Sequence, residues 1–388
     1  MSTQQFDVIV VGAALVGTSA AVALAEQGLK VALIDRKMPA FQPENESVWD
    51  SRIYAISPGN ADWLSALNVW QRMSLDRVAP IDAMHICSDD NPTPLIFSAD
   101  EAHADNLGFI LENANLHQAL WQSLKTHGIE IFEAEALHLN FSEDAAYLAL
   151  KDGLHLKANL IVGADGGNSW VRDQAGLSQQ KSIYEHVGVV ANFETELPHH
   201  GIARQWFVDD GILAWLPLPG RRISMVFSTK HSQDLMEMSA EALSEYVAQV
   251  GDYALGSMRC ITPAATFPLV KQKASAFVAP RLALVGDAAH QVHPMAGQGV
   301  NLGFRDVVAL IQTLSARHPA ADIGDYSLLR RYERARKADV LGMQSLTHGL
   351  YGLFDSHHPS VKAFRNWALR LPNSYPTIKR ALMRNALI

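Results

Sequence analysis

The segment FDVIVVGAALVGTSAAVALAEQGLKVALID, residues 6–35, decides the fold. Its first part, Phe6–Gly12, is a short β-branched apolar run typical of a buried parallel strand. The alanine-rich stretch Leu15–Gln27 has helical spacing and ends at Gly28, and Lys30–Asp35 predicts a second strand. A strand, a glycine turn, a helix and a strand ending in an acidic residue form the first unit of a dinucleotide-binding fold.

The turn itself reads GAALVG, and the dinucleotide fingerprint has glycine at its first, third and sixth positions. Here these positions hold Gly12, Ala14 and Gly17. The first makes the turn, the middle one lets the backbone approach a pyrophosphate, and the last lets the helix pack on the strand. Asp35, at the end of the second strand, can accept hydrogen bonds from ribose hydroxyls. Because an acid repels a ribose phosphate, FAD or NAD is favoured, with an ordinary α/β turn as the alternative.

A second turn is predicted by GADGGNSWVR, residues 163–172. Asp165 follows a buried strand, and Asn168 and Ser169 are residue types that cap helix N-termini. Taken alone, this segment fits a plain strand-to-helix turn as well as it fits a ligand site.

The most informative segment is VGDAAHQVHPMAGQGVNLGFRD, residues 285–306. A strand ends near Asp287, which places one carboxylate at the carboxyl edge of the sheet, where ligands of such sheets bind. A helix then opens at Gln298–Asn301, and its free N–H groups point toward the preceding loop. Such a terminus can stabilise a delocalised negative charge, for example on a reduced flavin ring. The residues that permit this tight loop are Pro294, Gly297 and Gly299.

The remaining chain predicts a second domain that interleaves with the first. Residues 183–228 alternate apolar and polar side chains, which indicates an antiparallel sheet. Residues 129–165 predict a meander that leads into a buried strand, and a helix is expected from Gly299 to Ala316. From Tyr326 onward the chain is predicted to be mostly helical. No proline- or glycine-rich linker separates these regions.

The length, net charge and cysteine content of the chain exclude several classes of protein. The 388 residues, of mass 42.5 kDa, predict two domains. A net charge of −8 gives no basic field for nucleic acid. Two cysteines, Cys87 and Cys260, do not make a disulfide framework. The N-terminus lacks the basic start of a secretory signal, and no apolar run reaches the length of a membrane span. We therefore expect a cytoplasmic protein.

The charge is unevenly distributed along the chain. Residues 357–388 carry six basic and no acidic side chains, together with several aromatic and aliphatic ones. Basic and aromatic residues at helical spacing are typical of an interfacial helix. A terminal helix packed on the body, with a solvated basic face, is the alternative.

The motifs GAALVG, GADGGNSWVR and GDAAHQVHPMAGQGVNLGFRD, in this order, resemble those of the single-component FAD-dependent aromatic hydroxylases, the group of para-hydroxybenzoate hydroxylase. Within that group the chain resembles most the ubiquinone (coenzyme Q) biosynthesis hydroxylases. Two departures are Ala14, in place of the usual middle glycine, and Asp35, where the family more often has glutamate. The supporting stretches are DSRIYAIS (50–57), LGFILENANLHQALW (107–121), ARQWFVDDGILAWLPL (203–218) and LLRRYERARKAD (328–339).

The resemblance implies an α/β fold of the para-hydroxybenzoate hydroxylase type. A Rossmann-like FAD-binding domain would be interleaved with an antiparallel-sheet substrate domain and followed by C-terminal helices. The implied boundaries are 1–80, 103–178 and 274–340 for the FAD-binding domain, 81–102 and 179–273 for the substrate domain, and 341–388 for the C-terminal helical region.

The resemblance also implies roles for individual residues. Gly12, Ala14 and Gly17 would line the pyrophosphate of FAD, and Asp35, followed by Arg36, would hold the adenosine ribose. Arg52 would approach the phosphate and ribityl chain, Asp165 would belong to a motif linked to FAD and to nicotinamide approach, and Asp287 would bind the ribityl hydroxyls. The loop beside the isoalloxazine would contain Pro294, Gly297, Gln298, Gly299, Val300 and Asn301. The substrate wall would contain Trp206, Trp215, Leu216 and Pro217, with a plain core role as the alternative for the tryptophans.

No side chain is expected to act as a catalytic nucleophile, because the cofactor carries the chemistry. The resemblance implies a monooxygenase in which reduced flavin and O2 form a flavin hydroperoxide that hydroxylates a phenolic ring. Only one nucleotide fingerprint is present, so NAD(P)H is expected to bind transiently, with electron delivery by another protein as the alternative. His290 and His293 form an HxxH pair without a third ligand, and no metal is expected.

The expected substrate is a polyprenylated phenol or quinol intermediate of ubiquinone biosynthesis. Two alternatives remain open at this point: a hydroxylase of a small soluble aromatic acid, clamped by Arg204, Arg221 or Arg222, and a flavoprotein subunit of a membrane-associated assembly. The expected partners are a ubiquinone-biosynthesis protein complex and the inner face of the membrane, contacted peripherally through the basic C-terminal tail. Nucleic acid is not an expected partner.

Overall fold

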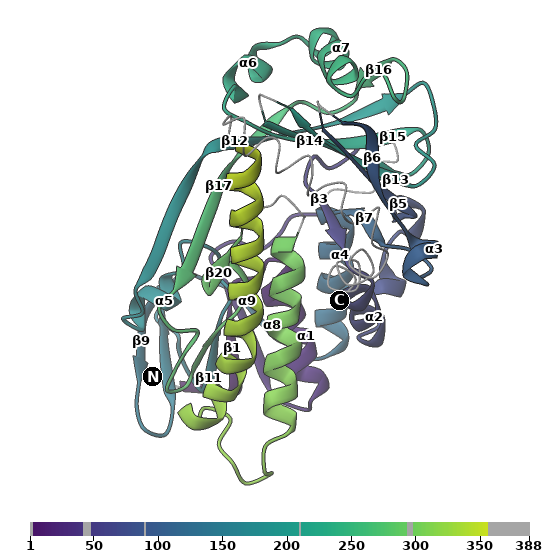
Figure 1. The fold of residues 1–388 in the computed structure, drawn as a ribbon. Coiled ribbons are helices and arrows are strands. Elements are labelled where there is room, and N and C mark those ends of the chain that lie inside the picture. Colours follow the sequence, from purple (N-terminus) through teal and green to yellow (C-terminus); the bar gives the residue numbers. More distant parts are fainter. Residues whose placement is uncertain (1–2, 42–47, 89–90, 209–210, 293–297, 356–388) are drawn as a thin grey trace.

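The computed structural model describes residues 3–41, 48–88, 91–208, 211–292 and 298–355. Within these ranges the chain forms three β-sheets and the helices that cover them (Figure 1). This architecture confirms the predicted α/β fold, with a Rossmann-like sheet and a second, antiparallel sheet.

The first sheet is mostly parallel and is built around the strand that opens the chain. β1 pairs in parallel with β11 on one side and with β2 on the other. Residues 8–11 are buried, as expected for a parallel strand covered on both faces. In spatial order the strands are β18 (Val278–Ala279), β19 (Leu282–Leu284), β11 (His155–Gly163), β1 (Thr3–Val11), β2 (Val31–Asp35) and β8 (Glu130–Glu133), with β10 (Ala146–Leu150) paired to β11 and β9 (Ala136–Phe141) paired to β10.

The second sheet contains the predicted antiparallel strands, and one short strand joins it to the third motif. Because β20 follows β19 after a short turn, residues 285–289 connect the two large sheets. In spatial order the strands are β20 (His290–Gln291), β17 (Ala265–Ala274), β12 (Gln179–Thr195), β15 (Arg222–Thr229), β14 (Gly211–Leu218), β13 (Ile202–Val208), β5 (Ala83–Ser88) and β6 (Asn91–Ser98), with β16 (Met258–Cys260) paired to β12.

The third sheet is small and lies between the two large sheets. Its strands are β3 (Ile53–Ile56), β7 (Gly108–Glu112) and β4 (Ala79–Ile81). Buried Ile81 and Ile110 of this sheet pack with Leu218 and Ala203 of the second sheet and with Trp49. The contact joins the dinucleotide-type unit to the antiparallel sheet through an apolar core.

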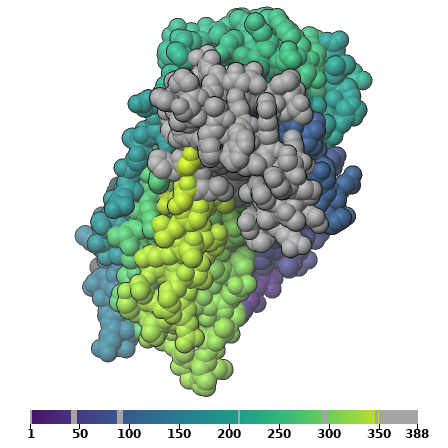
Figure 2. Space-filling model, viewed as in Figure 1, coloured from purple at the N-terminus to yellow at the C-terminus, as the bar shows by residue number. Residues whose placement is uncertain are grey.

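Helices cover both large sheets (Figure 1). α6 and α7 lie over the second sheet. α8 and α9 pack side by side along the part of the molecule that contains the first sheet, and α9 is exposed on the face seen in Figure 2. Among the described residues, no helix is long and apolar enough to cross a membrane. The helices are α1 (Leu15–Glu26), α2 (Pro58–Ala66), α3 (Ala99–Ala102), α4 (Asn113–Thr126), α5 (Trp170–Gln174), α6 (Ser232–Glu237), α7 (Ala240–Val250), α8 (Gln298–Ser315) and α9 (Tyr326–Asp355), with 3-10 turns η1 (Trp70–Arg72), η2 (Leu75–Arg77) and η3 (Gly286–Ala288).

The implied boundary between residues 340 and 341 falls inside a helix. α9 is continuous from Tyr326 to Asp355, and Val340 is fully buried against the core of the first sheet. The residues after Asp355 lie outside the described ranges. The helical pattern predicted from Tyr326 onward is therefore confirmed as far as Asp355, and the division of the chain into domains stays a prediction.

A buried carboxylate joins α8 to the turn that follows β19. Asp306 is fully buried and accepts hydrogen bonds from the Gly286 backbone N–H at 2.8 Å and from His290 Nε2 at 2.7 Å. Its other oxygen accepts from Arg336 Nε of α9 at 2.7 Å. One side chain therefore fixes the η3 turn, α8 and α9 with respect to one another.

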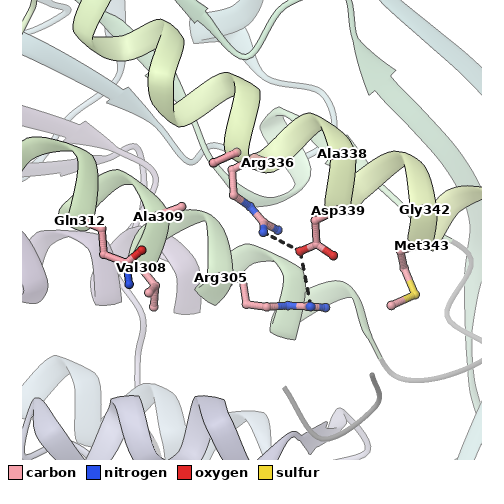
Figure 3. A pocket seen from close by; sticks show the side chains of 10 residues that line it. Arg305, Val308, Ala309, Gln312, Arg336, Ala338, Asp339, Gly342 and Met343 are labelled. Carbon is pink, nitrogen blue, oxygen red and sulfur yellow. Dashed lines mark hydrogen bonds and ion pairs between the residues drawn. The ribbon is translucent and has the colours of Figure 1, made fainter. Parts of the chain in front are cut away.

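The Arg336 guanidinium continues this network to the surface between the two helices (Figure 3). Arg336 Nη1 donates to Asp339 at 2.5 Å, and Asp339 also lies 3.4 Å from Arg305 Nη1. These ion pairs border a pocket of about 690 Å³ between α8 and α9. Burial alone would raise the pKa of Asp306, but the charges and hydrogen bonds of His290 and Arg336 lower it below the usual value.

We predict that Asp306→Asn destabilises the fold by about 3 kcal/mol, because it leaves buried Arg336 without its buried carboxylate partner and with only the part-exposed Asp339. The measurement is urea unfolding at neutral pH. Since the folded-state pKa of Asp306 is depressed, its contribution is present above about pH 4 and is lost as the pH falls through the lower folded-state value. The difference between variant and wild type should therefore shrink in acid.

The matched control is Glu135→Gln, which removes a carboxylate from an ion pair with Lys151 in which the side chains are 59% and 67% exposed. We expect the stability of this variant to stay close to that of the wild type, since exposed pairs contribute little. Equal losses in the two variants would contradict a special role for the buried carboxylate.

Candidate functional site

The glycine turn after β1 leaves a helix terminus open to an anion. Gly12 has φ +109°, and a Cβ at this position would lie 2.4 Å from the Ala164 carbonyl oxygen, while a Cβ at Gly17 would lie 1.9 Å from the Gly12 oxygen. Both glycines are therefore required. Among the described residues, no side chain caps the N-terminus of α1, and its first turn contains no acid. Its N–H groups and the helix dipole suit a phosphate group.

Ala14, at the middle fingerprint position, does not strain this turn. Its backbone is extended, with φ −78° and ψ −176°, a conformation that any residue adopts. The glycine usual here is therefore not required by backbone conformation.

Asp35 lies at the mouth of the same turn. Its Oδ2 accepts a hydrogen bond from the Ala13 backbone N–H at 2.7 Å, and Oδ1 accepts one from Lys37 N–H at 3.3 Å. Arg36 is exposed directly after it. The carboxylate thus lies beside the open helix terminus, as the fingerprint predicts for a ribose-binding acid.

Arg52 and Asp287, which are far apart in sequence, both act electrostatically on Tyr54. The Arg52 guanidinium is 6.0 Å from the centre of the Tyr54 ring. Burial raises the pKa of Tyr54, Arg52 lowers it, and Asp287 and Asp50 raise it further. Tyr54 therefore stays a neutral phenol between a cation and two carboxylates. This residue was not predicted as part of the site, although it lies inside DSRIYAIS.

Arg52 is also close to the nucleotide turn. Burial lowers the pKa of His117 on α4, and both Arg52 and Asp35 act on the same imidazole electrostatically. Asp35 and Asp287 follow the parallel strands β2 and β19 at one edge of the first sheet, and Arg52 directly precedes β3 of the third sheet. His117 was missed in the sequence, because a single histidine on an amphipathic helix carries no spacing signal.

Asp287 is the exposed residue of a buried turn. Gly286, Ala288 and Ala289 on both sides of it are buried, and Gly286 has φ +60°. The Asp287 Oδ2 accepts a hydrogen bond from Gln291 Nε2 at 2.9 Å. A carboxylate presented in this way is available to hydroxyl groups of a ligand.

The second and third motifs bind each other through two buried side chains. Arg172 is fully buried and donates from Nη1 to the carbonyl oxygens of Gly167 and Ala288, both at 3.1 Å. Gln272 Nε2 donates to Gly167 O at 2.8 Å and to Asp287 O at 3.4 Å. Arg172 could be suspected from its place in GADGGNSWVR, whereas Gln272 carried no signal.

Asp165 holds its own turn. Its carboxylate accepts from Ser169 Oγ at 2.5 Å and from Val171 N–H at 3.0 Å, and Ser169 in turn caps α5 as predicted. Burial raises the pKa of Asp165, and these hydrogen bonds lower it in part. Both carboxylate oxygens are engaged within the turn, so the structure shows Asp165 shaping the loop that Arg172 and Gln272 hold.

The start of α8 is anchored by Asn301. Its Oδ1 accepts from Ser57 N–H at 2.9 Å and from Asn60 Nδ2 at 2.8 Å, and its Nδ2 donates to Ala55 O at 2.7 Å. Its side chain thus joins α8 to β3 and α2 instead of facing outward. Gly299 and Val300 are half-buried at the same terminus, and of Gln298 only its place in the helix is described. Pro294 and Gly297 lie outside the described residues.

The four residues expected in the substrate wall do not share one face of the second sheet. Trp215 is fully buried, and the centre of its ring lies 4.4 Å from the centre of the Trp206 ring. Both tryptophans belong to a cluster packed against Leu243 and Val247 of α7. Pro217 pairs with Ile223 of the same cluster. Leu216, by contrast, packs toward the third sheet.

The reason is the alternation of side chains along β14, which sends neighbouring residues to opposite faces. A wall that faces the first unit therefore contains Leu216 but neither tryptophan. The inner face instead carries two rows of paired residues. One row contains Val190, Val226 and Ala214, and the other contains Asn192, Ser224 and Leu216.

These features together fit FAD. The uncapped α1 terminus suits a pyrophosphate, the Asp35 carboxylate suits a ribose, and the exposed Asp287 suits the hydroxyls of a ribityl chain. The start of α8 is anchored to β3 through Asn301.

Comparisons with known proteins identify the family. Residues 5–344 match the FAD binding domain. The chain is 34% identical over 395 residues to the 3-demethoxyubiquinol 3-hydroxylase of Escherichia coli, with 100% of both chains covered. It is also 34% identical over 388 residues to the ubiquinone hydroxylase UbiL of Rhodospirillum rubrum, covering 98% of this chain and 89% of that protein.

Solved structures show the same fold. The p-nitrophenol 4-monooxygenase PnpA of Pseudomonas putida superposes with a TM-score of 0.79 at 17% identity, covering 99% of both chains. PqsL of Pseudomonas aeruginosa superposes with a TM-score of 0.78 at 21% identity, covering 93% of this chain and 100% of that chain. The chain therefore belongs to the family of FAD-dependent aromatic hydroxylases that includes the hydroxylases of ubiquinone biosynthesis.

Proposed function

We propose that this enzyme hydroxylates the aromatic ring of a polyprenylated phenol or quinol in ubiquinone biosynthesis. FAD is its cofactor, O2 its co-substrate and NAD(P)H its transient electron donor. The observation that carries the proposal is the set of polar groups at the strand ends of the first sheet, namely the uncapped start of α1, Asp35 beside it and the exposed Asp287. The full-length similarity to ubiquinone hydroxylases supports it.

Each cofactor-binding group has one task. The turn at Gly12, Ala14 and Gly17 and the first turn of α1 bind the pyrophosphate, Asp35 binds the adenosine ribose, and Arg52 neutralises phosphate charge. Asp287 would orient the ribityl chain, and the N–H groups at the start of α8 would face the reduced flavin ring. When bound, FAD would pass two electrons from NAD(P)H to O2, so that one oxygen atom of O2 enters the substrate ring and the other leaves as water.

The inner face of the second sheet keeps the reacting region dry. Val190, Val226, Ala214 and Leu216 are half-buried on this face and carry no polar side-chain group, whereas Asn192 and Ser224 in the second row are polar. Apolar walls exclude water, which would otherwise divert the activated oxygen from the substrate. They also match the chemistry of a prenylated ring.

The arginines considered as a clamp for a soluble aromatic acid do not meet on this face. Arg204 pairs with Trp215 and so belongs to the opposite face of the sheet. Arg222 lies 5.3 Å from the Trp49 ring and 3.5 Å from Glu194, and Arg221 is exposed and donates to Glu196 O. A prenylated, uncharged substrate is therefore favoured over a small aromatic acid.

We further propose that the protein acts at the inner face of the membrane, within a protein complex of ubiquinone biosynthesis. The support is the C-terminal tail, residues 357–388, whose six basic residues are not offset by any acid. This tail lies outside the described residues, so the proposal rests on its sequence and on the apolar substrate.

Asp287→Ala is predicted to weaken FAD binding at least about tenfold, because it removes a charged acceptor of hydrogen bonds. The measurement is the flavin absorbance retained after purification, followed by titration of the flavin-free protein with FAD. The control is Asp144→Ala, at an exposed aspartate of the β9–β10 turn. Normal flavin content in the Asp287 variant would contradict the assignment.

Leu216→Arg tests both the proposed apolar substrate and the role of the inner face of the second sheet in binding it. The charge should reduce hydroxylated quinone more than about tenfold while flavin content stays normal, because only the apolar face changes. The measurement is mass spectrometry of quinones in a deletion strain that carries either the variant or the wild-type gene. Leu197→Arg, at a 48% exposed leucine, is the control. A deletion strain with unchanged quinones and no accumulated precursor would refute the proposed pathway.

The membrane proposal predicts that the full chain co-sediments with vesicles containing an anionic phospholipid and much less with neutral vesicles. Replacing Lys362, Arg365, Arg370, Lys379, Arg380 and Arg384 by Gln should weaken this binding at least about tenfold. Raising the salt concentration should have the same effect, since it screens the attraction. Equal binding of the wild type and the variant would contradict an electrostatic role of the tail.

A further inference from the structure

The backbone of Ala13 is held by three side chains from three different elements, two of which hold the Ala13–Ala14 peptide through its carbonyl oxygen. On one side, the Ala13 N–H donates to Asp35 Oδ2 of β2 at 2.7 Å. On the other side, the Ala13 carbonyl oxygen accepts from Thr18 Oγ1 of α1 at 3.0 Å and lies 2.7 Å from His117 Nε2 of α4. No other fingerprint position is held from three elements in the part of the chain that the structure describes.

The chemistry of the carbonyl group assigns the proton of His117. A carbonyl oxygen can only accept, so the contact requires that Nε2 carries the hydrogen. Burial lowers the pKa of His117, the bond to Ala13 raises it, and the Arg52 charge lowers it again while Asp35 raises it. The imidazole is accordingly neutral at neutral pH and binds as the Nε2–H tautomer.

The orientation of the ring is set by two aromatic neighbours. The Phe41 ring is 5.4 Å from the imidazole at an interplanar angle of 82°, and the Trp121 ring is 6.5 Å away at 86°. Both contacts are edge-to-face, the geometry that aromatic pairs prefer. The imidazole of His117 therefore contacts the Ala13 carbonyl oxygen in an orientation that its packing on α4 fixes.

The fixed carbonyl determines where the following N–H points. In a trans peptide the C=O of Ala13 and the N–H of Ala14 point in opposite directions. Because the carbonyl is directed toward His117 and Thr18, the Ala14 N–H is directed away from α4, together with the uncapped first turn of α1. This is the side on which an anion would bind.

We propose that His117 is a positioning residue for FAD. Its Nε2–H holds the Ala13–Ala14 peptide in the orientation in which the Ala14 N–H and the start of α1 bind the pyrophosphate. The proposal rests on FAD binding and not on the identity of the hydroxylated substrate, so its failure would leave the proposed substrate untouched.

The test compares two variants of the full chain after removal of flavin. His117→Leu removes the donor, and His117→Gln keeps an N–H at a similar reach. We expect His117→Leu to bind FAD about tenfold more weakly, the effect of one lost hydrogen bond to a binding loop. ADP, which carries the pyrophosphate but no flavin, should weaken by the same factor. His117→Gln should bind both ligands within about twofold of the wild type.

The control is His127→Leu, which removes a histidine near the other end of the same helix pair. His127 Nε2 lies 2.6 Å from Glu26 of α1, so this contact also joins α4 to α1 but does not touch the nucleotide turn. We expect unchanged affinities for FAD and ADP in this variant, even where its melting temperature falls.

Three results would overturn the proposal. They are unchanged FAD and ADP affinities in His117→Leu, equal losses in the Leu and Gln variants, or a loss for FAD without a loss for ADP. Melting temperatures measured on the same samples separate unfolding from weaker binding, since a folded His117→Leu protein that binds ADP normally contradicts the proposal directly.

Discussion

The buried carboxylate of Asp306 is the interaction on which the rest of the site depends. It accepts hydrogen bonds from the Gly286 backbone, from His290 and from Arg336, and it has no exposure to solvent. A charge in such a position is tolerated only when all of its partners are present. The η3 turn, the start of the second sheet at β20 and the two long helices α8 and α9 are therefore fixed as one unit. Asp287 projects from this unit, and its direction is set by residues that do not touch the ligand.

Two large sheets meet at this unit, and each contributes a different property. The parallel sheet ends in polar groups and open helix N-termini, as the geometry of such sheets requires. The antiparallel sheet contributes an apolar inner face. Arg172 and Gln272 join the two motifs at the junction through hydrogen bonds to backbone oxygens. A charged, hydrogen-bonding cofactor and an apolar ring can therefore be held next to each other without either environment being disturbed.

Much of this arrangement could be predicted from local patterns. The first strand, helix and strand follow from residues 6–35, because hydrophobic runs and glycine positions report on buried parallel strands. The convergence of Asp35 and Asp287 follows from their places at strand ends. His117, Tyr54 and Gln272 could not be predicted, since their roles arise from contacts between segments that are distant in sequence. The face on which Trp215 lies could not be predicted either, because the exact start of the strand alternation was unknown.

The alternation along β14 has a consequence for how the enzyme can change. Leu216 belongs to the inner face of the second sheet, whereas Trp215 belongs to the core that α7 covers. Alternate positions of one strand are therefore under separate selective pressures. Substitutions at Ala214, Leu216 or Val226 can change the substrate preference while the packing of the core on the other face is kept. Insertion of a single residue would exchange the two sets at once. Diversity in this family is therefore expected to accumulate by replacement along these strands, with length changes confined to the connections between them.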